Sequence, residues 1–83
     1  MIETRLRRLV RHIGAARLVR VTAIKERQRW QTVATNQKVK ARVEDLEQLI
    51  EAFPQYREWL LSGEARAPGQ AAPEFDEQGD EQP

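Results

Sequence analysis

The sequence predicts a compact all-α domain of four to five helices that includes a helix-turn-helix. Apolar residues recur at spacings of three and four before Gly63, and that period is typical of amphipathic helices. Gly14 and Pro54 interrupt the pattern, and residues of these two types commonly mark helix boundaries. The chain after Gly63 is polar and rich in Pro, Gly and acids. We therefore expect a helix-turn-helix domain over residues 1–63 and a disordered acidic tail over residues 64–83.

The first helix is expected over residues 2–13, where one apolar stripe runs along a helix that is otherwise rich in arginine. The stripe is formed by Ile2, Leu6, Leu9, Val10 and Ile13. Gly14 can adopt the positive φ that often ends a helix. A second helix is expected over residues 15–21, and a helix so short must be held by packing.

A turn at residues 22–24 leads to a candidate recognition helix over about residues 25–34. Trp30, Val33 and Ala34 give that helix an inner face, and we expect Trp30 to anchor it in the core. The other side carries long hydrogen-bonding side chains, which suit base edges in a major groove. The predicted base contacts are Lys25, Gln28, Arg29, Gln31 and Thr32. The predicted phosphate contacts are Arg17, Thr35, Asn36, Lys38 and Lys40.

A loop over residues 35–41 should separate the recognition helix from a fourth helix over residues 43–53. A short last helix is expected from Pro54 to Leu61. It carries more bulky apolar groups than one buried side needs, so we expect a homodimer with this helix near the contact. The predicted interface residues are Tyr56, Trp59, Leu60 and Leu61. Alternatively, these four side chains close the core of a monomer.

Charge is distributed unevenly along the chain, although the formal net charge is only +1. Residues 1–42 carry a balance of +10, and residues 43–83 carry a balance of −9. Such asymmetry favours contact between the basic half and a nucleic acid, and double-stranded DNA is the expected partner. The alternative is that the charge has no binding role and only keeps the domain soluble.

Other functional classes find little support. The chain has one His, no Cys, no Gly-rich phosphate loop and no metal-ligand spacing, so we expect no enzyme activity, cofactor or metal. It also lacks an apolar run of membrane-spanning length or a signal peptide. We expect a cytoplasmic protein without membrane contact.

The C-terminal half resembles small phage and prophage DNA-binding proteins of the lambda-repressor-like class. The matching residues of the last helix and its tail are Pro54, Tyr56, Trp59, Leu60, Gly63, Gly69, Gln70 and Pro73, and an Arg-Trp pair matches Arg29 and Trp30. The resemblance covers about residues 4–75. It implies a λ-repressor-like domain that regulates transcription of phage or mobile-element genes. This chain departs from the family in having Ala23 where Gly is usual, and in a segment from the turn to Trp30 that is one residue longer.

A protein-binding adaptor is the alternative function. The basic amphipathic helix over residues 2–13 could dock on an acidic host protein and inhibit it, or lie on an anionic membrane. The position of the basic residues should discriminate. A surface shared by Arg17, Lys25, Gln28, Arg29, Thr32 and Lys38 favours DNA, whereas an exposed basic first helix beside a buried recognition helix favours a protein partner.

Overall fold

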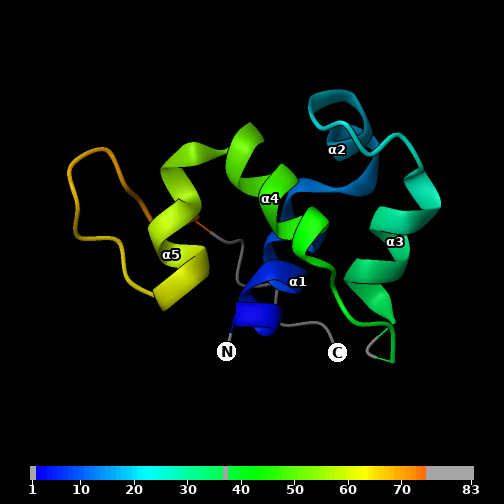
Figure 1. Ribbon diagram of the computed structural model, residues 1–83, viewed down its shortest axis with the longest axis horizontal. Coiled ribbons are helices and arrows are strands. Elements are labelled where there is room, and N and C mark those ends of the chain that lie inside the picture. Colours follow the sequence, from blue (N-terminus) through cyan, green and yellow to red (C-terminus); the bar gives the residue numbers. More distant parts are fainter. Residues whose placement is uncertain (1, 37, 75–83) are drawn as a thin grey trace.

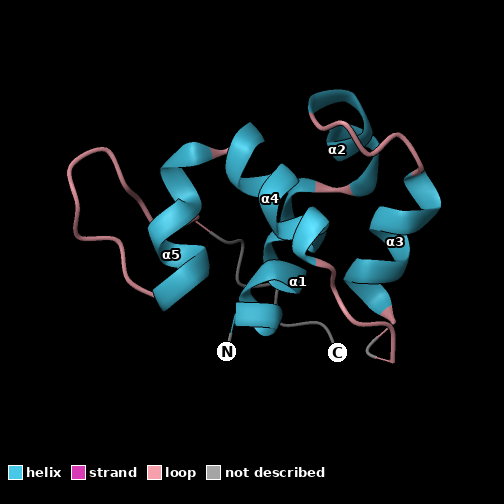
Figure 2. Cartoon of the chain, in the orientation of Figure 1, coloured by secondary structure: helices cyan, strands magenta, loops and turns pink. Residues whose placement is uncertain are grey.

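The computed structural model describes residues 2–36 and 38–74, which form five α-helices and one 3-10 helix and contain no strand (Figures 1 and 2). The elements are α1 (Ile2–Ile13), α2 (Ala15–Val21), α3 (Arg27–Thr35), α4 (Val43–Ala52), η1 (Pro54–Tyr56) and α5 (Arg57–Ser62). The predicted all-α architecture is confirmed. None of the described helices is both long and apolar enough to cross a membrane.

The core is built around α1, which contacts α2, α3 and α5. Every α-helix contributes buried apolar side chains to one cluster. Its buried members are Leu6, Leu9, Val10, Leu18, Trp30, Val33, Leu49, Phe53, Trp59 and Leu60. Trp30 is fully buried, so the prediction that it anchors the third helix is confirmed.

The bounds of α1 and α2 match the prediction, and Gly14 separates the two helices at φ +92°. The connection between α2 and α3 differs from the prediction. It spans residues 22–26, so α3 begins at Arg27 rather than near Lys25. No non-glycine residue in the described ranges has a positive φ. The longer connection therefore accommodates Ala23 without the strain that a tight turn would impose.

Residues 64–74, here called the C-terminal segment, do not follow the expectation of disorder. The Glu58 carboxylate accepts two backbone N–H groups of this segment. The Gln70 side chain accepts a hydrogen bond from the Glu58 backbone at 2.8 Å and donates one to the Pro54 carbonyl at 3.0 Å. Pro73 is buried. The rest of the predicted tail, residues 75–83, lies outside the described residues.

Removal of the C-terminal segment is therefore expected to destabilise the domain. A chain that ends at Gly63 loses these hydrogen bonds and the burial of Pro73, which together should cost about 1–2 kcal/mol. Its Tm should fall by roughly 5–15 °C below that of a chain ending at Glu74. Thermal unfolding followed by circular dichroism measures the difference, and equal Tm values would contradict the docking of this segment.

Candidate nucleic-acid interface

The connection and the start of α3 are tied to the core by polar groups as well as by burial. The Trp30 Nε1–H donates to the Ile24 carbonyl at 3.2 Å. The backbone N–H of Ala23 donates to the Gln48 side chain of α4 at 2.7 Å. Thr22 is buried, and its hydroxyl donates to the Leu18 carbonyl at 2.6 Å. These contacts fix the position of α3 relative to α2.

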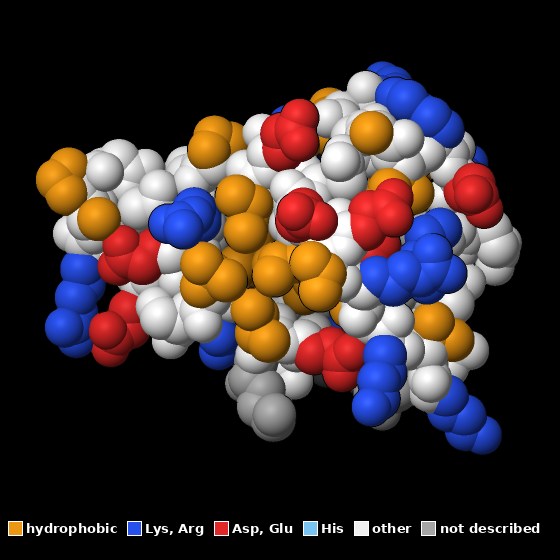
Figure 3. Space-filling model, in the orientation of Figure 1, with side chains coloured by type: hydrophobic (Ala, Val, Ile, Leu, Met, Phe, Trp, Pro, Cys, Tyr) orange, Lys and Arg blue, Asp and Glu red, His pale blue; other side chains and the backbone are white. Residues whose placement is uncertain are grey.

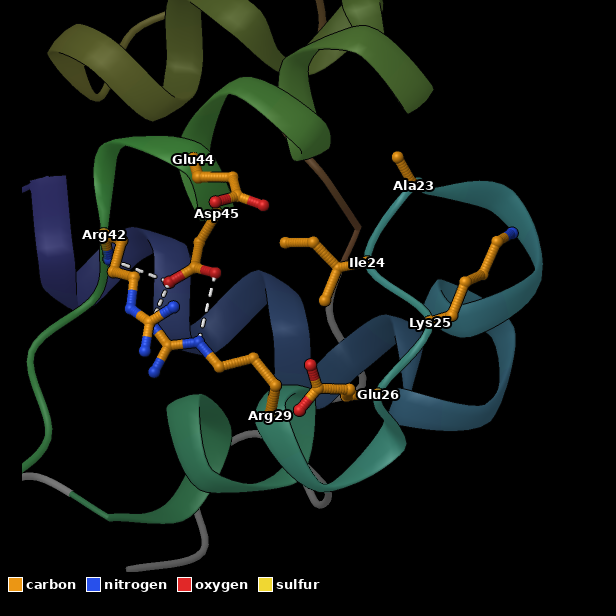
Figure 4. Close-up of a pocket in the computed structure, with 8 residues that line it drawn as sticks. All are labelled: Ala23, Ile24, Lys25, Glu26, Arg29, Arg42, Glu44 and Asp45. Atoms are coloured by element: carbon orange, nitrogen blue, oxygen red, sulfur yellow. Dashed lines mark hydrogen bonds and ion pairs between the residues drawn. The ribbon is translucent and has the colours of Figure 1, made fainter.

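An ion pair between Arg29 and Asp45 joins α3 to the first turn of α4 (Figure 4). Two guanidinium nitrogens of Arg29 donate to the two carboxylate oxygens, Nε at 3.3 Å from Oδ1 and Nη2 to Oδ2. Asp45 is only 1% exposed and also accepts the Arg42 backbone N–H at 2.8 Å, as an N-terminal helix carboxylate often does. The pair lines a polar cavity of about 410 Å³ beside the connection.

Arg7 of α1 holds the other end of α3. Its guanidinium is largely buried and donates to the carbonyls of Val33 at 2.7 Å, of Asn36 at 3.0 Å, and of Val39. The last carbonyls of a helix lack hydrogen-bond donors within the helix, and the Arg7 guanidinium donates to them. Glu3 lies 3.8 Å from the same guanidinium and accepts the Ala41 N–H. The loop between α3 and α4 is thus fixed to α1.

The structure divides the predicted base-contact residues. Gln28 and Gln31 are exposed on the outer side of α3, and Thr32 beside them is half-buried. Arg29 does not share that surface, because its side chain is 12% exposed and pairs with Asp45. Lys25 lies in the connection before α3, where its ammonium donates to the Val19 carbonyl at 3.0 Å.

The predicted phosphate contacts lie at two places. Thr35, Asn36, Lys38 and Lys40 are exposed at the end of α3 and in the loop that follows. Arg17 lies on α2, with its guanidinium carbon 5.6 Å from the centre of the Phe53 ring. Basic side chains gather over the α2–α3 side of the face in Figure 3, and acidic ones gather over α4.

The predicted dimer residues do not form one exposed surface. Trp59 and Leu60 are buried in the core of the single chain, which corrects their assignment to an interface. Tyr56 is half-buried and stacks on Phe53, whereas Leu61 is 43% exposed. A second apolar surface lies where α1 and α4 begin, with Ile2 37% and Val43 74% exposed. A hydrophobic patch lies near the centre of the face of the molecule that Figure 3 shows.

The sequence prediction did not include Arg27, an exposed residue at the start of α3. Its side chain forms no hydrogen bond or ion pair with any other residue that the structure describes. The signal that could have found it is helical spacing. Arg29 precedes the buried Val33 by four residues and therefore shares its side of the helix, whereas Arg27 precedes the exposed Gln31 by four.

A solved phage protein is similar to this chain over nearly its whole length. Pf6r from the filamentous phage Pf6 of Pseudomonas aeruginosa PA01 has 41% sequence identity with it and a TM-score of 0.76. The similarity covers 92% of this chain and 99% of Pf6r. No family model matches the chain. No curated protein matches it either.

Arg7→Met is expected to destabilise the domain by about 1–3 kcal/mol, because it leaves the carbonyls near the end of α3 without their donor. Met replaces much of the volume of Arg, so the loss of hydrogen bonds dominates. Urea unfolding measures the effect. Arg11→Met is the matched control, since Arg11 is exposed on the same helix and its loss should change stability by under about 0.5 kcal/mol. Equal stability of the two variants would contradict the role of Arg7.

Proposed function

We propose that this chain, which belongs to the same family as the phage protein Pf6r, is a sequence-specific DNA-binding regulator of phage or prophage genes. It acts on duplex DNA in the cytoplasm, most simply as a repressor. The kinship supports a phage role. The observation that carries DNA binding is α3, a helix held firmly on its inner side while its outer side presents Arg27, Gln28 and Gln31 to solvent.

The surroundings of α3 suit a major groove. Arg, Gln and Thr side chains can match the donor and acceptor pattern of base edges there. The loop after α3 presents Lys38 and Lys40, whose charges suit the flanking phosphates. Arg7 fixes this loop to α1. The lysines of the loop and the outer side of α3 can therefore contact DNA as one rigid surface.

The alternative, a protein-binding adaptor that uses the basic face of α1, is less well supported. Arginines of α1 serve the fold. Arg7 is buried against the end of α3, and Arg5 Nε donates to the Leu60 carbonyl at 3.1 Å. The outer side of α3 is exposed rather than buried. The predicted DNA contacts do not all share one surface, since Arg29 pairs with Asp45 and Arg17 lies against Phe53. The preference for DNA over an acidic protein partner therefore rests on the exposed outer side of α3 and on the α1 arginines that the fold uses.

A homodimer remains part of the proposal, with a revised contact. One short recognition helix reads few base pairs, and two-fold dimers double the site. Since Trp59 and Leu60 are buried within one chain, the better contact is the apolar surface around Ile2 and Val43. It borders a groove of about 200 Å³ that is also lined by Leu6 and Leu46. An exposed apolar patch of this kind favours association.

Binding to duplex DNA is expected to depend strongly on salt. If the basic surface neutralises about five phosphates, log affinity should fall with log salt at a slope near −4 to −5. Titrations of a fluorescent duplex from about 50 to 200 mM salt give this slope. An affinity that stays constant over that range would exclude the proposed function.

Gln28→Ala and Lys38→Ala should separate base contact from phosphate contact. Loss of Gln28 should change discrimination at one base position by roughly 1–3 kcal/mol. Loss of Lys38 should weaken all duplexes alike and make the salt slope shallower by about one. Both side chains are exposed, so each variant should fold. Identical base preferences for Gln28→Ala and the unmodified protein would remove Gln28 from the reading surface.

Val43→Glu should give a folded monomer with weaker operator binding. Val43 is the first residue of α4, where an acid is favourable for the helix, so any loss of assembly would not come from unfolding. Light scattering gives the mass of the variant in solution. Leu61→Glu tests, in the same way, the contact at the last helix that the sequence predicts. The dimer is excluded if the unmodified protein is monomeric at tens of micromolar and still binds a specific duplex.

A further inference from the structure

Two arginines in the first turn of α3 occupy opposite environments. Arg29 is held by the buried Asp45, and its side chain is 12% exposed. Arg27, two residues earlier, is exposed, and its side chain forms no hydrogen bond or ion pair within the described part of the chain. The two side chains have the same chemistry, so they differ only in whether the guanidinium is already paired within the domain.

We propose that these arginines have separate tasks: Arg27 recognises a guanine, whereas Arg29 acts through Asp45 as a positioning residue for α3. The inference rests on the proposed function and assigns roles within it. It replaces the sequence prediction that Arg29 itself reads a base.

Arg27 suits recognition for geometric and chemical reasons. It is the first residue of α3, and recognition helices commonly present their N-terminal residues to base edges. Its guanidinium can donate two parallel hydrogen bonds to O6 and N7 of guanine, the commonest specific contact in the major groove. Gln31 follows four residues later on the same side of the helix, so the two side chains would follow one groove.

Arg29 is unsuited to that task because its guanidinium is already committed. To reach a base it would abandon a carboxylate that is 1% exposed, and a buried charge without its partner is strongly unfavourable. Asp45 is itself fixed by the Arg42 backbone N–H. The pair therefore sets the position of the first turn of α3 relative to α4, and with it the position of Arg27 and Gln28 against DNA.

Arg27→Ala and Arg29→Ala form a matched pair, since each removes one positive charge from the same helical turn. Selection from a random duplex pool first defines the preferred duplex of the unmodified protein. Each protein is then titrated, at a temperature where it is fully folded, against that duplex, its single-base variants and an unrelated duplex. Thermal unfolding of each protein is measured separately. Arg66→Ala is the charge control, because Arg66 is exposed in the C-terminal segment, at the opposite end of the molecule from α3 (Figure 1).

Arg27→Ala should keep the Tm and lose discrimination at one G·C pair by about 5- to 150-fold. Arg29→Ala should lower the Tm, keep the order of base preference at every position, and reduce the affinity ratio between the preferred and unrelated duplexes. A merely structural role would leave that ratio unchanged in the folded protein. Arg66→Ala should leave base preference and Tm unaltered.

If Arg29→Ala does not fold, Asp45→Asn makes the same comparison, because it removes the ion pair while keeping the shape of the side chain. The assignment is overturned if Arg27→Ala keeps all discrimination, if Arg29→Ala or Asp45→Asn loses it at a single G·C pair, or if the affinity ratio stays unchanged in the folded positioning variant. In those cases a preferred duplex still exists and the proposed function stands. If the unmodified protein selects no duplex sequence, the proposed function fails and this assignment fails with it.

Discussion

A short helix must be held by its neighbours, and this constraint shapes the whole domain. The nine residues of α3 have no side chain capping their N-terminus, and a helix of that length is marginal in water. Three kinds of contact compensate. The helix's own Trp30 is buried in the core, Asp45 of α4 binds Arg29 near the start of α3, and Arg7 of α1 binds the carbonyls near its end. The partners of all three side chains lie outside α3, so α3 has its position only when the rest of the domain is folded.

Much of this fold could be predicted from the sequence, because apolar spacing and glycine positions are local signals. The boundaries of α1 and α2 and the burial of Trp30 follow from them. The connection between α2 and α3 could not be placed so well. Within it, the Ala23 N–H donates to Gln48, which is 25 residues away in the chain, and a contact at that distance leaves no trace in local spacing.

The candidate site was harder to predict than the fold. An arginine adds the same charge to the sequence whether its side chain faces solvent or pairs with a buried acid. Arg7, Arg29 and Arg5 all contribute to the basic balance of the N-terminal half, yet each donates to a group within the domain. Formal charge therefore overstates what this half can offer a partner. Similarly, Gln70 and Glu58 hold a segment whose composition alone is typical of disorder.

The central position of α1 has a consequence for synthesis of the chain. Its apolar stripe is synthesised well before one of its partners, α5, and the bond from Arg5 to the Leu60 carbonyl spans 55 residues. A ribosome adds about 5–20 residues per second, so α1 waits some seconds with its stripe incompletely covered. During that interval the part of the stripe that packs on α5 has no partner to bury it. Folding of the domain is therefore expected to be completed after translation of α5 rather than helix by helix.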